Sequence, residues 1–384
     1  MDITVIIVLV IVTALAFDFT NGFHDTANAV ATSIATGALK PRTAVLIAGV
    51  LNLVGAFLSV QVAKTISSGL VDDTKITPTV IFAGLVGAIV WNLLTWLVGM
   101  PSSSSHALIG GLIGATWVAA GADAVKFAGL VGKVLLPAVL APIIAGMIAL
   151  IATFLAYRIT ARGGQRTVTK GFKLGQIVSG SMVALAHGTN DAQKTMGVIT
   201  LTLITAGVLP AEAGPPFWVI LSSGLAIAVG TYVGGWRIIQ TLGMRVSTIE
   251  TPQGFAAGTS TATVILTSSH LGFPLSTTQV ATGSIFGAGT ARGVASVRWG
   301  IGGQVAVAWL LTLPTAAAFG AVAAWMAATG PLGTIIVVLV LVGVAGGIYA
   351  ASRRRPVTAD NINDLQARSQ QADIARRDDE DIAA

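Results

Sequence analysis

The chain contains no cysteine and few charged residues. The complete absence of cysteine among 384 residues excludes disulfides and thiolate or iron–sulfur metal sites. Charged residues make up 10% of the chain and hydrophobic residues 54%, whereas soluble domains carry about 25% charged residues. This composition excludes an ordinary water-soluble domain and indicates a protein whose surface lies in lipid.

Long apolar runs recur along the sequence. Each is close to the length that a helix rising 1.5 Å per residue needs to cross a hydrocarbon core of about 30 Å. The runs span 43–63, 78–98, 128–156, 216–236, 299–326 and 331–350. The sequence therefore predicts an all-α, polytopic membrane protein.

The formal net charge of +6 does not indicate nucleic acid binding, because the basic residues lie at the ends of the apolar runs. Lys and Arg in short loops set membrane orientation and are retained on the cytoplasmic side. The clusters are Arg158, Arg162, Arg166, Lys170 and Lys173; Arg237 and Arg245; and Arg353, Arg354 and Arg355. The expected partner is the lipid bilayer, with no nucleic acid.

Placing the basic clusters inside gives a tracing with about 11 crossings, in a range of about 10–12, because short helices can be re-entrant hairpins. We expect a first repeat at 1–156, a basic cytoplasmic loop at 157–173, a second repeat at 174–330, a final transmembrane helix at 331–350 and a disordered cytoplasmic tail at 351–384. The tail prediction follows from the mixture of Asp, Arg, Gln and Asn without apolar periodicity.

An internal repeat links the two halves. "GMPSSSSHALIGGLIGA" at 99–115 aligns with "GFPLSTTQVATGSIFGA" at 272–288 without a gap, and 6 of the 17 positions are identical. In the tracing above, the two halves cross the membrane in opposite senses. Paired interrupted segments in inverted halves indicate a transporter with its binding site near the midplane of the bilayer.

A polar stripe interrupts the first apolar segment. Its residues are Asp18, Asn21, Asp25, Asn28 and Thr32, spaced by 3, 4, 3 and 4 and hence on one helical face. A fainter copy at 184–197 places His187, Asp191 and Lys194 at the positions of Asn21, Asp25 and Asn28. A charge at the bilayer centre costs at least ~2.5–3.5 kcal/mol. The stripe therefore predicts a bound cation, a proton or a basic partner such as Lys194, with interhelical hydrogen bonding as the alternative.

The repeated hydroxyl-rich segments have a different chemistry. Pro101 and Pro274 favour the first turn of a helix, and hydroxyl side chains follow each of them. Helix N-termini with such donors bind anions, so 102–105 and 276–278 are expected to surround a tetrahedral oxyanion. The alternative is helix capping with close packing at the glycines of Gly110-x-x-x-Gly114 and Gly283-x-x-x-Gly287.

All four histidines, His24, His106, His187 and His270, fall in these polar segments. Histidine transfers protons near neutral pH, and we assign a coupling role only to His24 and His187. No arginine lies in the apolar interior. An anion would then be neutralised by a co-bound cation or held by neutral donors.

Four segments are similar to the signatures of the inorganic phosphate transporter family, the Pit or PHO4 group: "FHDTANAVAT", "AHGTNDAQKTMG", "GMPSSSSHALIGG" and "GFPLSTTQVATGS". The resemblance covers roughly residues 10–350 and is strongest to the bacterial low-affinity type. It implies phosphate–cation symport across the plasma membrane by two inverted repeats with re-entrant hairpins, in a homodimer. By the same resemblance, Asp25, Asn28, Asn190 and Asp191 hold the coupling cation, and Ser103, Ser104, Ser105, Ser276, Thr277 and Thr278 hold phosphate.

The chain departs from the sodium-coupled members of that family. Those members resemble this chain but carry a glutamate at the position of Asn52. They carry a second glutamate near the position of Gly258, and this chain lacks both. His24 and His187 resemble the proton-coupled branch, whose substrates include neutral divalent metal–phosphate complexes. We therefore expect a co-transported proton, no cofactor and no fixed metal. Sodium held by Asp25 and Asp191 is the alternative, with sulfate or arsenate as other substrates.

Two other classes of protein were weighed. An intramembrane serine hydrolase needs one serine activated by one base, and the four consecutive serines beside His106 fit this poorly because the second copy has Gln279 instead. A passive channel is less favoured, because buried carboxylates are typical of coupled carriers. The prediction is a transporter and not an enzyme.

Overall fold

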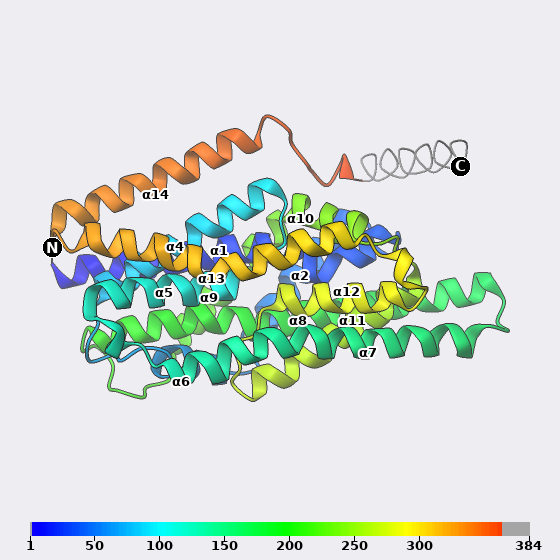
Figure 1. Cartoon of the computed structure of the whole chain (residues 1–384), viewed down its shortest axis with the longest axis horizontal. Coiled ribbons are helices and arrows are strands. Elements are labelled where there is room, and N and C mark those ends of the chain that lie inside the picture. The colour runs from blue at the N-terminus through cyan, green and yellow to red at the C-terminus, as the bar shows by residue number, and fades with distance from the viewer. Residues whose placement is uncertain (1, 363–384) are drawn as a thin grey trace.

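The computed structural model describes residues 2–362, and this part of the chain is a bundle of long helices (Figure 1). The helices are α1 (Ile3–Ala35), α2 (Pro41–Gly55), α3 (Gln61–Ser68), α4 (Pro78–Val98), α5 (Ser104–Ala120), α6 (Phe127–Leu130), α7 (Leu136–Thr160), α8 (Gln165–Thr205), α9 (Phe217–Val233), α10 (Trp236–Gln240), α11 (Thr251–His270), α12 (Thr277–Thr290), α13 (Trp299–Ala327) and α14 (Pro331–Ser352). A π-helical turn, Val131–Leu135, joins α6 to α7.

Five helical spans among the described residues are long and apolar enough to cross a membrane: α1, α4, α6 with α7, α13 and α14. A sixth candidate consists of α9 and the helix after it, which meet at a bend of 59° and form either a broken span or a re-entrant loop. Apolar side chains cover the outside of these helices, for example on α7 and α14. The prediction of an all-α, multi-pass membrane protein is confirmed.

One of the predicted apolar runs is wrong as a single span, and another is one continuous helix only as far as Gly234. The run 43–63 is broken between α2 and α3, where Gln193 Oε1 accepts the backbone N–H groups of Val62 at 2.8 Å and Ala63 at 3.2 Å. This side chain caps a new helix start, which makes the break possible inside the protein. The run 216–236 ends at Gly234, whose φ of 80° a helix cannot accommodate.

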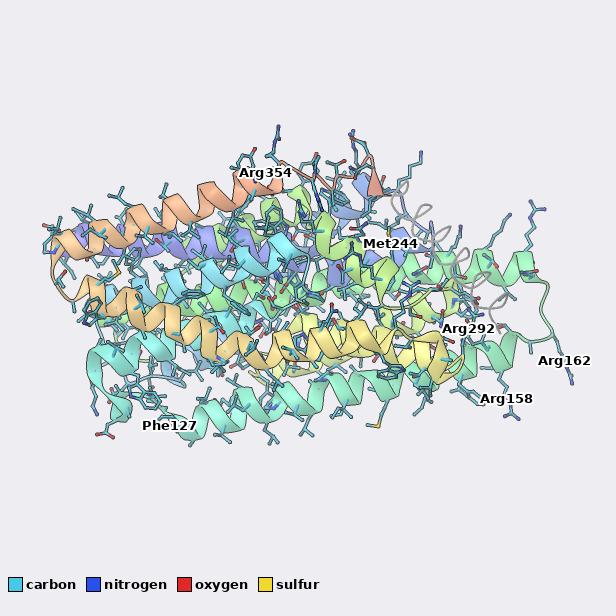
Figure 2. The ribbon with its side chains drawn as sticks, turned by 45° about the horizontal axis from the view of Figure 1, so that its top comes forward. Phe127, Arg158, Arg162, Met244, Arg292 and Arg354 are labelled. Atoms are coloured by element: carbon cyan, nitrogen blue, oxygen red, sulfur yellow. The ribbon has the colours of Figure 1, made fainter. Side chains whose placement is uncertain are left out.

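The basic α7–α8 loop lies at one end of the molecule, whereas Arg354 lies nearer the middle (Figure 2). Figure 2 shows Arg158, Arg162 and Arg292 together at one end and Phe127 near the other. In Figure 1, α1 begins at the end of the molecule opposite the connection between α7 and α8. The cytoplasmic placement of the α7–α8 loop stays a prediction of the positive-inside rule.

The two hydroxyl-rich segments form short interrupted helices, α5 and α12. Their 17 and 14 residues span about 26 Å and 21 Å at 1.5 Å per residue, less than the ~30 Å hydrocarbon core. In Figure 1, α5 lies towards the end that carries the N-terminus and α12 towards the other end. Both helices thus start inside the protein.

The placement of Pro101 and Pro274 in the first turn of these helices was wrong. The helices begin three residues later, with Ser103 and Ser276 as N-caps. Ser103 Oγ accepts the backbone N–H of His106 at 3.1 Å, and Ser276 Oγ that of Gln279 at 3.2 Å. A hydroxyl N-cap satisfies one free N–H, which proline at the first position does not do.

The start of the predicted disordered tail lies partly within the described residues. There, Arg42 donates to Asp360 at 2.9 Å and Ile362 is buried. These residues therefore contact the α2 end of the bundle. Residues 363–384 of that predicted tail lie outside the described part of the chain.

Candidate substrate and ion site

Four helices bring the polar residues of the sequence together in the interior. The helices α1 and α8 carry Asp25 and Asp191, and the N-termini of α5 and α12 point at these two acids. Asp25 is 1% exposed and Asp191 0%. Because helix N-termini carry partial positive charge, the site combines two buried acids with two positive helix ends.

Asp25 accepts hydrogen bonds on both carboxylate oxygens. His24 Nδ1 lies 2.6 Å and Thr278 Oγ1 3.0 Å from Oδ1. Ser104 Oγ lies 2.6 Å and Thr277 Oγ1 3.4 Å from Oδ2. Hydroxyls from both interrupted helices thus converge on one acid of α1.

Asp191 is surrounded in a similar way. Its Oδ1 receives Lys194 Nζ, and its Oδ2 lies 3.0 Å from His187 Nε2 and 3.1 Å from Thr277 Oγ1. Asn21 Nδ2 approaches Oδ2 at 3.5 Å. Thr277 therefore lies between the two acids and joins them into one network.

Lys194 is fully buried and makes three contacts with oxygen. Besides Asp191, its Nζ donates to Ser105 Oγ at 2.6 Å and to the backbone carbonyl of Leu275 at 2.9 Å. Leu275 lies in the non-helical connection before α12. The ammonium thus neutralises one of the two acids, as expected for a buried charge.

A hydrogen-bonded chain leads away from Asp25 through His24. The ring nitrogen Nε2 of His24 lies 3.3 Å from both Thr95 Oγ1 and Ser102 Oγ, which lie 2.8 Å from each other. Thr95 was not predicted as a site residue. Its sequence signal is a threonine in the last turns of a mostly apolar helix, four residues before the "GMPSSSS" segment.

Asn52 of α2 contacts His187 on the side of the ring that faces away from Asp191. Asn52 Oδ1 lies 3.1 Å from His187 Nδ1. The orientation of the amide follows from its other end, where Nδ2 donates to Thr231 Oγ1 at 2.7 Å, and Thr231 donates to Gly22 O at 3.3 Å. Asn52, noted in the sequence only as a departure from a family pattern, therefore orients a site histidine.

The two asparagines of the stripes have different surroundings. Asn28 Nδ2 donates to Thr278 Oγ1 at 3.1 Å and approaches Thr277 Oγ1 at 3.4 Å. Asn190 Nδ2 instead donates to Ser269 Oγ at 2.9 Å and approaches the Phe273 carbonyl at 3.4 Å, at the α11–α12 connection. Asn28 belongs to the acid network, whereas Asn190 holds the hairpin.

The six hydroxyls predicted to bind phosphate divide into three groups. Ser104, Thr277 and Thr278 donate to the buried acids, and Ser105 accepts from Lys194. Ser103 and Ser276 are N-caps. All six lie at the starts of α5 and α12, and all are buried.

Two further features concern cations. Asp25, His187 and Asp191 each offer one ligand atom, and these atoms lie within 4.8 Å of one another. Asp18, on the same face of α1, is 0% exposed, and neither carboxylate oxygen has a hydrogen-bond partner among the described residues. The interior thus holds three acids against the ammonium of Lys194.

A multi-pass helical bundle with buried acids, a buried ammonium and helix N-termini at interrupted helices defines a membrane transporter. The family model described as "Phosphate transporter family" matches residues 21–320. The chain belongs to this family.

Similar proteins carry the same kind of name. A "Probable low-affinity inorganic phosphate transporter" of Mycobacterium tuberculosis (strain H37Rv) is 54% identical over 361 residues, which cover 93% of this chain and 87% of that protein. One with the same name from Rhizobium meliloti is 44% identical over 317 residues, covering 82% and 95%. A solved structure titled "The sodium-dependent phosphate transporter" has a TM-score of 0.75 at 26% identity, covering 84% of this chain and 98% of that one.

Proposed function

We propose that this protein imports inorganic phosphate together with protons by alternating access. The observation that carries the proposal is the pairing of each buried site acid with a histidine: His24 Nδ1 lies 2.6 Å from Asp25, and His187 Nε2 lies 3.0 Å from Asp191. Carboxylate–histidine chains in membrane interiors serve as proton relays. Phosphate as the substrate rests on the family and on the names of the relatives.

The surroundings of His187 support a proton at this site, because its Nε2 atom is buried and has no hydrogen-bond partner among residues 2–362. Because Asn52 presents its carbonyl oxygen, the Nδ1 atom of His187 must carry hydrogen to donate to it. In a neutral ring, Nε2 would then face the Asp191 carboxylate with a lone pair at 3.0 Å. A second proton, on the ring or on the carboxyl, removes this repulsion, so the pair is built to hold one.

The proposed phosphate site lies at the N-termini of α5 and α12. Their backbone N–H groups and the hydroxyls of Ser104, Ser105, Thr277 and Thr278 offer donors, and Lys194 offers positive charge. These are the groups that bind tetrahedral anions at helix starts. The roles of Ser103 and Ser276 in this proposal are to fix the helix starts as N-caps.

The inverted arrangement of 1–156 and 174–330 is part of the proposal. Ser105 pairs with Lys194, and at the matched positions Thr278 pairs with Asn28. Each pair joins one half to the other, as a two-fold relation requires. Two such halves moving against each other around a central site would give alternating access.

The sodium-coupled alternative uses the same acids. Asp25, His187 and Asp191 are close enough to share a cation, and the similar solved structure is titled as sodium-dependent. In the proton-coupled proposal, these atoms bind protons instead of a sodium ion. The transported form is either free phosphate or a neutral metal–phosphate complex, and the magnesium dependence of uptake distinguishes the two. The proposed assembly is a homodimer.

A second candidate function rests on a specific geometry. Ser102 Oγ, His24 and Asp25 are joined in the order of a hydrolase triad, at 3.3 Å and 2.6 Å. Ser102 is 0% exposed and also bonds to Thr95, which favours a relay over a nucleophile. Covalent labelling of Ser102 by a fluorophosphonate would support hydrolysis, and failure to label supports transport.

The proposed function is tested by uptake of radiolabelled phosphate into proteoliposomes. With a proton gradient and no sodium, we expect uptake above the diffusion control, and a protonophore should abolish it. Competition with sulfate and arsenate ranks the oxyanions. Uptake driven equally well by a sodium gradient at constant pH would overturn the proton assignment.

A further inference from the structure

The ammonium of Lys194 lies in an oxygen cage of the kind that holds an alkali cation. Its ligands are the carboxylate of Asp191, the hydroxyl of Ser105 at 2.6 Å and the carbonyl of Leu275 at 2.9 Å. Leu275 belongs to the non-helical stretch before α12, and unwound carbonyls with carboxylates are the usual sodium ligands of transporters. The side chain is 0% exposed, so no water competes from outside.

The other half of the site has no such fixed charge. At the position matching Lys194, α1 carries Asn28, whose Nδ2 donates to Thr278 as Lys194 does to Ser105. The oxygen Oδ1 of Asn28 has no hydrogen-bond partner among residues 2–362. Asp25 is therefore left with His24 and hydroxyls, without a permanent cation.

We propose that Lys194 is a tethered counter-cation that occupies a monovalent-cation position beside Asp191. It makes the α8 half of the site independent of sodium and leaves the Asp25 half as the one that exchanges its cation during transport. This inference deepens the proposed function. It rests on that function for the assignment of Asp25 to the half of the site that exchanges its cation. It predicts that removing the ammonium creates a sodium site.

The test measures the melting temperature of the purified full chain in NaCl, KCl and choline chloride at equal ionic strength. The wild type should melt at the same temperature in all three salts. Lys194→Asn, which copies the α1 half, and Lys194→Ala should gain a sodium-specific rise of about 5 °C at a sodium concentration near 100 times its Kd. The control is Lys126→Ala, since Lys126 also donates to a backbone carbonyl, that of Ser68 at 2.7 Å, but in an exposed region.

A folded Lys194→Asn or Lys194→Ala protein without a sodium response overturns the proposal, because the lysine would then be only half of a structural ion pair. The sodium-specific rise of each variant is compared with that of the wild type, and an equal rise in the wild type and the variants also overturns the proposal. Should neither variant fold, a wild type without a sodium-specific rise supports the proposal, and a wild-type rise that Asp25→Asn retains overturns it. Melting does not depend on transport, so a failure of proton-driven uptake leaves this result standing, and the two failures are distinguishable.

Discussion

The hydroxyl oxygen of Ser104, at the start of α5, lies 2.6 Å from Oδ2 of Asp25 on α1. A hydroxyl has one proton to donate, so Ser104 cannot donate to Asp25 and to phosphate at once. Protonation of Asp25 would weaken this bond and release Ser104 towards an anion. The contact thus offers a direct physical link between proton binding and phosphate binding, which is a coupling free energy between two ligands.

Substitution of Asp25 tests this link. Asp25→Asn keeps the size of the side chain but cannot take up and release a proton. We expect proton-driven phosphate uptake to fall by at least about 100-fold, in the range found for loss of an acid–base group, while the protein still elutes as a folded species. Asp72→Asn, in the loop before α4, serves as the control and should stay within about twofold of wild type. Coupled uptake by Asp25→Asn would refute the role of this acid.

The hydroxyl of Ser104 can be removed separately. Ser104→Ala should raise the KM for phosphate by about tenfold or more, since a hydrogen bond to a charged partner contributes about 1.5–3 kcal/mol. Ser104→Thr retains the hydroxyl and should recover most of the affinity. Ser68→Ala, which removes an exposed hydroxyl on α3 bonded to Lys64 O, is the matched control. An unchanged KM in Ser104→Ala would separate this serine from the phosphate site.

The histidines give a third prediction. His187→Gln retains a side chain of similar length but cannot carry a positive charge, so proton-driven uptake should fall to less than about a tenth of wild type. His270→Gln is the control, because His270 is exposed and its one hydrogen bond within residues 2–362 is to its own helix, at Leu266 O. The measurement is uptake at several external pH values. Equal losses in both variants would show that the effect is not specific to the site.

Close packing at the interrupted helices gives a prediction for stability. A Cβ atom on Gly287 would lie 1.9 Å from the carbonyl oxygen of Gly146 on α7. Gly287→Ala should therefore destabilise the protein by about 1–3 kcal/mol and lower its melting temperature. Gly347→Ala, on α14, should have little effect, because no atom of the described residues beyond its own stretch of helix lies within 4 Å of the added carbon. Equal melting temperatures for the two variants would contradict the packing of α12 on α7.

Much of the fold was predictable because its signals are local. Apolar runs predicted α4, α13 and α14, and the 3-and-4 spacing of the polar stripe predicted that α1 stays helical through Asp25. Close packing at the glycine pairs of the repeat, given as the alternative to anion binding, is present in the structure. What failed were the ends and breaks: the start of α3 depends on Gln193, more than 120 residues away, and no local pattern contains that information.

The candidate site shows the same division. Periodicity and the repeat singled out Asp25, Asp191 and the hydroxyl segments, which the structure brings together. Sequence reasoning could not assign partners to them, because hydroxyls expected to face an anion donate to acids instead. The contact between Asn52 and His187, 135 positions apart, is visible only once α2 packs on α8.

The most direct test of the account is the proton flux that phosphate itself drives. Liposomes containing the protein and an internal pH indicator, in sodium-free buffer, receive an inward phosphate gradient at equal internal and external pH. The account predicts internal acidification beyond that of protein-free liposomes, and its loss in Asp25→Asn. Phosphate entry without such acidification, or acidification that requires sodium, would contradict the account.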